Sequence, residues 1–384
     1  MTVNNKIYLD YNATTPVDAR VLDTMLPCFN EKFGNAGSDH IFGWDAEDAV
    51  EHSRAQIAKL LNCRSSEIIF TSGATEAANL ALFGFTKSNK SKGKHIITAK
   101  TEHKAILDTM KVLEDDGFKI TFLDVDAEGN IDLNELEQTI TSETILVCIM
   151  LANNETGLVH PIKEIGKIVH GSGVKLMSDI TQAVGKIPVD LKEMNLDLAV
   201  FSSHKIYGPK GVGVLYINKK NKVDVEPHIF GGGQEKGMRA GTLNVPGIVG
   251  FGKAAEIAYS EMEEESNRIE QLRNKMEVLL EYVEGAGINS KNAHRLPNTT
   301  NISFKNIAGN LLLRKLNSLA VSRGSACSSN IIKPSHVLKA MGLSDELALS
   351  SLRISLGKQT TEADIDFAAG EIKKIVNQLK SVVL

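Results

Sequence analysis

The stretch that decides the fold is Leu196-Asp-Leu-Ala-Val-Phe-Ser-Ser-His-Lys-Ile-Tyr-Gly-Pro-Lys-Gly-Val-Gly-Val-Leu-Tyr216. It contains two apolar runs, Leu198–Phe201 and Val212–Ile217, with the length and β-branched content typical of buried strands. Between them lie small polar residues, a single early lysine, Lys205, and a Gly-Pro turn. A lysine delivered from a buried strand end suits a Schiff-base amine, because a partly desolvated, electropositive site lowers its pKa. An ordinary solvated lysine is the alternative.

A second strand-like run, Val174–Asp179, ends in an acid. The carboxyl ends of strands in an open α/β sheet meet at one crevice, so Asp179 and Lys205 are expected to converge there. Pyridoxal phosphate needs such a pair: the lysine binds it covalently, and the carboxylate keeps the pyridine nitrogen protonated so that the ring accepts electrons. Asp179 taken alone also fits an N-cap. The two strand ends together favour the cofactor.

Two further segments could hold the phosphate of this cofactor. Thr71–Asn79 opens a helix, and its small residues, including Ala74, let backbone N–H groups approach an anion while Thr75 adds a hydroxyl. A capped helix is the alternative, and the lysine of a nucleotide-binding P-loop is missing. The glycine-rich loop Ile229–Asn244 contains Thr242 and basic residues. Further donors near the lysine are Ser202, Ser203 and His204.

Three polar residues are candidates for contacts with the ring or with a substrate. His103 begins a helix after a strand, where an imidazole can stack on a flat ring and move protons; a capping histidine is the alternative. Asn154 follows an apolar strand and could bind the cofactor or a carboxylate, unless its segment is a plain loop. Arg353 lies in a strand-like alternation and could bind a carboxylate through two N–H groups, or be a surface residue.

Cys327 differs from the other three cysteines, Cys28, Cys63 and Cys148. It is flanked by small residues and serines, outside any amphipathic pattern, so we expect a mobile loop in which the thiol is chemically available. The surroundings of the other three are typical of a helix or a strand, where a thiol is an inert apolar side chain. The wide spacing of the four argues against a disulfide framework and against a zinc site.

Composition limits the class of protein. With 384 residues, the chain exceeds the size of one compact core, which predicts two domains. The formal net charge of -4 argues against binding to nucleic acid or to an anionic membrane. The N-terminus lacks the apolar core of a signal peptide, and no apolar run approaches the roughly 20 residues of a membrane span. We therefore expect a cytoplasmic protein.

Strand-like and helix-like segments alternate up to about Phe251. This rhythm predicts an α/β fold with a large, mostly parallel sheet covered on both faces. A long amphipathic helix over Gly252–Glu284 follows and bridges to a smaller α+β region. The predicted division is a large domain of residues 13–256 and a small domain of residues 1–12 and 257–384 that carries the Cys327 loop.

Taken together, these pieces resemble the NifS/IscS-like cysteine desulfurases, pyridoxal-phosphate enzymes of the class V aminotransferase group. Each matching segment is a weak pattern, but their joint order is specific and runs nearly end to end. The segment around Cys327 is similar to the group with an extended cysteine loop. The matching segments are Tyr8–Pro16, Thr71–Asn79, Thr101–His103, Asn153–Gly157, Ser178–Gln182, Ser202–Lys205, Gly231–Thr242, Gly324–Ser328 and Ser350–Ser355.

The resemblance implies the fold type I of pyridoxal-phosphate-dependent transferases and an obligate homodimer. It implies conversion of L-cysteine to L-alanine, with the sulfur captured as a persulfide on Cys327. The sulfur would pass to an acceptor protein, for iron–sulfur cluster assembly or another thiolation pathway. No intrinsic metal site is implied, although Cys327 could transiently ligate an iron–sulfur cluster.

The resemblance also implies residue roles. Lys205 would bind the cofactor covalently, Asp179 would contact the pyridine nitrogen, His103 would stack on the ring, and Gln182 would lie near the phenolic oxygen. The phosphate would be held by Thr75, Ser202 and His204, with Thr242 contributed by the other subunit, and the substrate carboxylate would be bound by Asn154 and Arg353.

Three departures from the family pattern stand out. Arg323 replaces a small residue and should favour the Cys327 thiolate, and Ala36 replaces a frequent proline. The chain ends soon after its last helix, without the tail that many relatives use to dock an iron–sulfur scaffold, which leaves the acceptor open. Two other functions also stay open: an aminotransferase or selenocysteine lyase in which Cys327 is incidental, and a non-catalytic α/β binding module.

Overall fold

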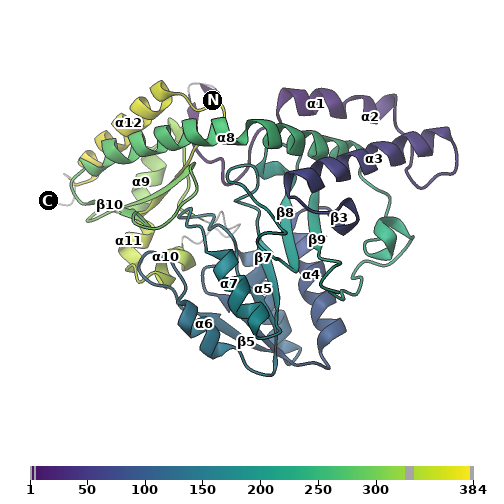
Figure 1. The fold of residues 1–384 in the computed structure, drawn as a ribbon. Helices are drawn as coiled ribbons and strands as arrows, with labels where there is room; N and C mark the ends of the chain where they lie inside the picture. Colours follow the sequence, from purple (N-terminus) through teal and green to yellow (C-terminus); the bar gives the residue numbers. More distant parts are fainter. Residues whose placement is uncertain (1, 4–5, 325–332, 381–384) are drawn as a thin grey trace.

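A seven-stranded sheet forms the framework of the larger part of the molecule (Figure 1). The computed structural model describes residues 2–3, 6–324 and 333–380. The strand order is β3-β9-β8-β7-β6-β4-β5, and every neighbouring pair is parallel except the two made by β9. The predicted α/β class with a mostly parallel sheet is thus confirmed. The strands are β3 (Ile68–Thr71), β4 (His95–Ala99), β5 (Lys119–Leu123), β6 (Thr144–Cys148), β7 (Lys175–Asp179), β8 (Leu198–Ser202) and β9 (Gly213–Ile217).

The antiparallel pairing of β8 with β9 follows from their short connection, residues 203–212. Parallel neighbours need a crossover of a dozen or more residues, usually a helix, and this loop is too short to provide one. The loop therefore turns back at the carboxyl end of β8. It carries Lys205, which is consequently held at the edge of the sheet where the parallel strands end.

Helices cover both faces of this sheet, so most strand residues are buried and apolar residues occur at successive positions rather than alternating. One face packs against α4 (Ala74–Asn89) and α5 (Lys104–Asp115). The other face packs against the helices α3 (Ile41–Leu60), α6 (Leu133–Thr139), α7 (Ile162–Gly171) and the first half of α8 (Val245–Glu281). The short helices α1 (Ala19–Met25) and α2 (Pro27–Asn30) lie against α8.

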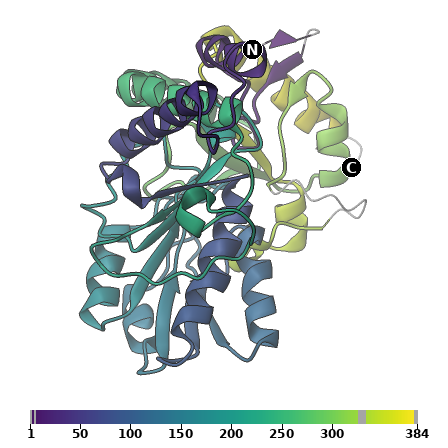
Figure 2. The ribbon, with the colours of Figure 1, turned by 90° about the vertical axis from the view of Figure 1, so that its right-hand side faces the viewer.

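The rest of the chain forms a smaller part with two three-stranded sheets, β10-β11-β13 and β1-β2-β12. The N-terminal strand β2 pairs in parallel with β12, and Figure 2 shows the purple N-terminal strands beside the yellow C-terminal region. The strands are β1 (Thr2–Val3), β2 (Lys6–Tyr8), β10 (Ala286–Asn289), β11 (Thr299–Phe304), β12 (Leu319–Ala320) and β13 (Leu352–Ser355). The helices are α9 (Gly309–Lys315), α10 (His336–Ala340), α11 (Asp345–Leu349) and α12 (Glu362–Lys380).

The long helix α8 runs across both parts of the molecule (Figure 1). Its first half contributes Phe251 to the core of the large sheet, and its second half contributes Met276 to the core of the small part. The long predicted helix is confirmed, but it begins earlier, because the Asn244 side chain caps it and a proline occupies its first turn. The predicted boundary between residues 256 and 257 lies inside α8, and the division into two domains stays a prediction.

The sequence reading missed several short elements, among them α6 and α11. The start of each helix is marked by a polar capping residue and not by a repeat of apolar residues. Asp132 accepts hydrogen bonds from two N–H groups of α6, and Ser344 accepts one from α11. Helices this short carry too few apolar residues to establish a period. None of the described helices is long and apolar enough to cross a membrane.

Candidate active site

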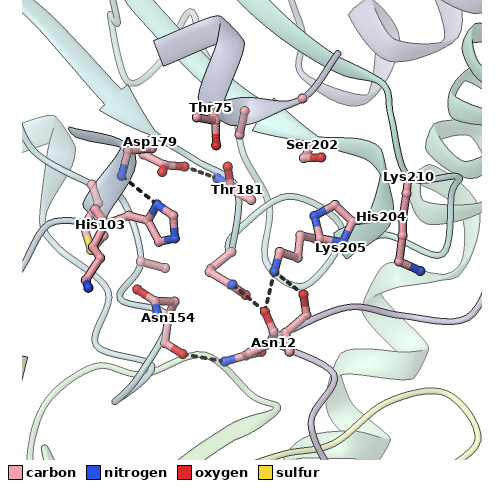
Figure 3. A pocket seen from close by; sticks show the side chains of 18 of the residues that line it. Asn12, Thr75, His103, Asn154, Asp179, Thr181, Ser202, His204, Lys205 and Lys210 are labelled. Carbon is pink, nitrogen blue, oxygen red and sulfur yellow. Dashed lines mark hydrogen bonds between the residues drawn. The ribbon is translucent and has the colours of Figure 1, made fainter. Parts of the chain in front are cut away.

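A cavity of about 630 Å³ opens where the carboxyl ends of the large sheet meet the small part of the molecule. Figure 3 shows its labelled side chains converging from several elements: His103 and Asp179 on one side, Lys205 and His204 on the other. Arg353 of β13 completes the wall from the small part. The predicted site residues among its lining are Ala74, Thr75, His103, Asn154, Asp179, Gln182, Ser202, His204, Lys205 and Arg353.

Lys205 lies in a 3-10 turn that directly follows β8. Its Nζ donates to the backbone oxygens of Asn12 and Ala13, each at 2.6 Å. Burial lowers the pKa of Lys205 from its ordinary value to about 8, with Arg353 adding to this effect and two carboxylates opposing it. The amine is therefore close to losing its proton near neutral pH, as a nucleophilic lysine requires.

Asp179 ends β7 and is 7% exposed. Its Oδ1 accepts a hydrogen bond from the Thr181 N–H at 2.9 Å, but a turn and not a helix follows β7, so the alternative assignment of Asp179 as a helix N-cap is wrong. No residue in the described part of the chain hydrogen-bonds Oδ2, which leaves that oxygen available to a ligand. The contact with Thr181 fixes the direction of the carboxylate and leaves its second oxygen for a ligand.

The amino end of α4 forms a further wall of the cavity. Its N-cap is Gly73, and no side chain caps the first backbone N–H groups. The Thr75 hydroxyl has no hydrogen-bond partner among the residues that the structure describes. A helix start with free N–H groups attracts an anion, and the uncapped start of this 16-residue helix therefore suits a phosphate.

Two histidines face the cavity with little tendency to carry charge. The Nδ1 of His103 accepts the Ala105 N–H at 3.2 Å and caps α5, so the proton of a neutral ring is on Nε2. Burial lowers the pKa of His103 despite the nearby Asp179. Burial, followed by the charge of Lys205, lowers the pKa of His204 to about 4. At neutral pH both rings act as neutral hydrogen-bonding groups.

Arg353 is buried, with 3% of its surface exposed, and is not the surface residue of the alternative reading. Its Nη2 donates to Asp10 Oδ1 at 2.7 Å, and its Nη1 donates to the Asn154 backbone oxygen at 3.0 Å. Nε has no partner within the described residues. Asn154 also lines the cavity (Figure 3).

Two predicted site residues within the described part of the chain, Ser203 and Thr242, are not brought to this cavity. Ser203 is fully buried and packs against Gly208, where a Cβ would lie 1.9 Å from the Ser203 Oγ. Thr242 is exposed in the glycine-rich loop and is not part of the lining. Cys327 lies outside the described residues. Gly324, three positions before it, does line the cavity, and a Cβ there would lie 2.2 Å from Glu155 Oε2.

The sequence reading also missed residues that the fold brings to the site. Asn12 contacts Lys205 and Gln182 through its backbone oxygen, and Lys210 lines the cavity beside His204. Below the cavity lies Glu102, whose Oε1 accepts the Met150 N–H at 2.5 Å. The only signal was membership in the quoted segments, because Asn12 falls in Tyr8–Pro16 and Glu102 in Thr101–His103.

This set of groups fits the predicted cofactor. An amine of lowered pKa suits an aldehyde, a buried carboxylate oxygen without a partner suits a pyridinium N–H, and an uncapped helix start suits a phosphate. The buried guanidinium of Arg353 suits the carboxylate of an amino acid. Each group alone is common in proteins, but their convergence in one cavity points to this cofactor and to an amino-acid substrate.

Comparisons with known proteins support the same cofactor and the same class of substrate. The model of the aminotransferase class-V family matches residues 7–367. The chain is 50% identical over 378 residues to cysteine desulfurase IscS of Anaeromyxobacter sp. (strain Fw109-5), covering 98% of this chain and 94% of that protein. A solved NifS-like protein superposes with a TM-score of 0.91 at 42% identity, covering 97% and 100% of the two chains. The structure of SspA in complex with cysteine superposes with a TM-score of 0.82 at 37% identity, covering 91% and 98%.

Proposed function

The chain belongs to the aminotransferase class-V family as a pyridoxal-phosphate-dependent cysteine desulfurase, and we propose that Cys327 receives the sulfur of L-cysteine in its reaction. The family, its fold type I and its cofactor are those expected from the sequence, and these expectations are confirmed. One observation supports the residue roles above all others: Lys205, Asp179 and Arg353 line one cavity, with the lysine pKa lowered to about 8.

Pyridoxal phosphate, when bound, supplies an electron sink that lets a proton leave the α-carbon of an amino acid. Lys205 would hold it covalently, and Asp179 would accept a hydrogen bond from its ring nitrogen. His103 would lie against its ring. Once the substrate amine has replaced it on the cofactor, the freed Lys205 Nζ would take the substrate proton and return it, which its lowered pKa would permit near neutral pH. The phosphate would be held by Ala74, Thr75, Ser202 and His204.

Arg353 and Asn154 would orient the substrate carboxylate. Two N–H groups of the guanidinium are engaged, by Asp10 and by a backbone oxygen, and these contacts hold its plane in one direction. The remaining N–H groups of Nη1 and Nη2 would donate to a carboxylate, whereas the unpartnered Nε is buried away from the cavity. A buried guanidinium that is already held in one orientation binds a carboxylate more tightly than the guanidinium of a mobile surface arginine.

The sulfur step needs a thiolate. The Cys327 thiolate would attack the sulfur of cysteine, an S–S bond forms while the Cβ–S bond breaks, and the carbon takes up a proton to give alanine. The products are alanine and a Cys327 persulfide, whose outer sulfur passes to a thiol of an acceptor protein. The other three cysteines are poor candidates, because burial raises the pKa of Cys28, Cys63 and Cys148. Cys63 follows α3 in a bend rather than within a helix or strand.

A homodimer would explain the position of Thr242. The glycine-rich loop that carries it is held by its own chain: Arg239 pairs with Glu76, and the buried Glu235 pairs with Arg54, both at 2.8 Å. Thr242 itself is exposed and does not line its own cavity. Presented in this way, its hydroxyl would contact the phosphate bound to a second copy of the chain.

The test is Cys327→Ser. A serine hydroxyl is a far weaker nucleophile toward sulfur than a thiolate, so the variant should keep its fold and visible cofactor absorption but release neither alanine nor transferable sulfur. The measurement is alanine formed per minute, with mass spectrometry of the Cys327 peptide for one added sulfur atom. Cys63→Ser is the matched control and should remain active. Full activity of Cys327→Ser would favour the aminotransferase or lyase alternative.

A further inference from the structure

A second lysine, Lys186, lies beside Lys205 behind the wall of the active-site cavity. The two lysines line the same narrow side cavity of about 50 Å³. The Lys186 Nζ donates to Gln182 Oε1 at 2.8 Å and to Asn12 Oδ1 at 3.5 Å. None of the roles assigned above uses this amine. A lysine amine is seldom buried in a protein unless it has hydrogen-bond partners, so the partners of Lys186 indicate its role.

The backbone around Lys186 is held from two sides. Its carbonyl accepts the hydroxyl of Ser266, a residue of α8, at 2.6 Å, and its N–H donates to the Ala183 oxygen at 3.0 Å. The preceding Gly185 has a φ of +73°, and a Cβ there would lie 2.8 Å from the Ile206 side chain. These contacts fix where the lysine stem starts. The direction of the amine toward Gln182 is therefore a property of the fold.

Gln182 is buried at 6% exposure and lines the active-site cavity. Its Nε2 donates to the Asn12 backbone oxygen at 3.0 Å, and the same oxygen accepts the Lys205 Nζ at 2.6 Å. The two ends of a glutamine amide have nearly the same shape, and only their partners decide which end is nitrogen. A reversed amide would set Gln182 Oε1 against the Asn12 carbonyl, and two acceptors would face each other.

Lys186 provides the partner that the other end of this amide needs. A lysine amine donates hydrogen bonds whether it is charged or neutral, so it matches Oε1 in either state. Burial, with the charges of Lys205 and Arg353, lowers the pKa of Lys186 well below its ordinary value, and the contact survives loss of the proton. The second N–H of Nε2 then remains free to face the cavity.

We infer that Lys186 is a positioning residue that locks the Gln182 amide, so that an N–H rather than a carbonyl oxygen faces the cofactor beside Lys205. This inference rests on the proposed position of Gln182 near the phenolic oxygen of the cofactor. An N–H at that oxygen stabilises its negative charge, which favours loss of the proton from the bound cofactor and lowers the pH at which its visible absorption changes. A carbonyl oxygen there would have the opposite effect.

The experiment is a pH titration of the visible absorption of the holoenzyme without cysteine. Lys186→Met keeps the length of the stem but removes the donor, and it should raise the midpoint by about 0.5–1 pH unit, a three- to tenfold change in proton affinity. Lys186→Arg keeps a donor and should titrate near the wild-type midpoint. Lys192→Met is the matched control, because Lys192 also donates to a side-chain amide oxygen, that of Asn62 at 3.1 Å, but on the surface.

A double-mutant cycle separates positioning from a direct effect of charge. If Lys186 acts through the amide, Lys186→Met should cause no further shift in a Gln182→Leu background. An equal shift in both backgrounds, or an unchanged midpoint in Lys186→Met alone, overturns the inference. Should Lys186→Met not retain the cofactor, a shift in Lys186→Arg as large as in Gln182→Leu overturns it instead. Because no cysteine is present, these results do not depend on the outcome for Cys327→Ser.

Discussion

Two cations reach the same cavity from different parts of the molecule and are held in different ways. Lys205, at the edge of the large sheet, donates to two backbone carbonyls, whereas Arg353, in the small part, donates to the carboxylate of Asp10 and to one carbonyl. Carbonyls favour an ammonium less than a carboxylate does, so burial dominates and lowers the lysine pKa to about 8. A guanidinium is always charged in proteins, and the Asp10 carboxylate compensates its charge in the buried site. One cation is placed to lose its proton, and the other to keep its charge.

Lys205→Ala removes the amine that gains and loses a proton, and it has the largest expected effect. No other amine can bind the cofactor at this position, so turnover should be lost completely while the fold is retained. The measurements are alanine formation and the visible absorption of the purified protein. Lys210→Ala is the matched control: this exposed lysine lines the same cavity, and its loss should leave the absorption in place. Near wild-type turnover in Lys205→Ala would contradict the assignment.

Arg353→Ala removes the cation that keeps its charge. A charge-assisted, bidentate pair contributes on the order of 1.5–3 kcal/mol, so KM for cysteine should rise about ten- to a hundredfold with cofactor binding largely unchanged. Arg353→Lys should restore only part of this loss, because an ammonium cannot reproduce the planar fork. Steady-state kinetics of the three proteins decide the point, and equal KM values would remove Arg353 from the substrate site.

The reactivity of Lys205 toward pyridoxal phosphate should depend on pH differently from that of a solvated lysine. Below about pH 8 most of the Lys205 amine of the apoprotein would be protonated, and only the neutral fraction can attack an aldehyde. Its rate of capture of pyridoxal phosphate should therefore rise about tenfold per pH unit up to about pH 8 and then level off. A solvated lysine would continue to gain reactivity beyond about pH 10. The growth of visible absorption after mixing gives the rate, and pyridoxal without phosphate controls for ionisation of the phosphate.

Asp10→Asn should have the smallest effect and connects the two cations. The Asp10 carboxylate raises the pKa of Lys205 as well as holding Arg353, so its neutral replacement should lower the midpoint of the capture rate, by a few tenths of a pH unit. A half-buried aspartate away from the site, Asp190, gives the matched control Asp190→Asn. An unchanged midpoint in Asp10→Asn would show that the charge of Asp10 has no effect at Lys205, and an upward shift would contradict the expected sign.

Local pattern was sufficient to predict the strand ends that carry the site. β7 and β8 are buried on both faces and must be apolar, and each ends where the chain first offers a polar side chain to the cavity. Asp179 and Lys205 could be identified for this reason. The start of α4 could be predicted in the same way, since small residues before a helical pattern are typical of a helix N-terminus that no side chain caps.

The direction of single side chains beyond a strand end could not be predicted. Ser202 and Ser203 are neighbours and both looked like phosphate donors, yet only Ser202 lines the cavity. Successive residues of an extended chain point to opposite sides, and the 3-10 turn that begins at Ser203 sends its hydroxyl toward Gly208. The sequence motif contains both serines, but the backbone conformation directs only the Ser202 side chain into the cavity.

The positions of Asp179 and Lys205 at neighbouring strand ends could be predicted from local pattern, and that of Arg353 from the family resemblance. What each of them touches follows from the packing of distant segments. Asn12 is 193 positions from Lys205, and Asp10 is 343 positions from Arg353. Contacts between segments so far apart leave no local period or spacing. Whether a buried cation meets a carbonyl or a carboxylate depends on which distant segment crosses the cavity wall, and that is settled by packing.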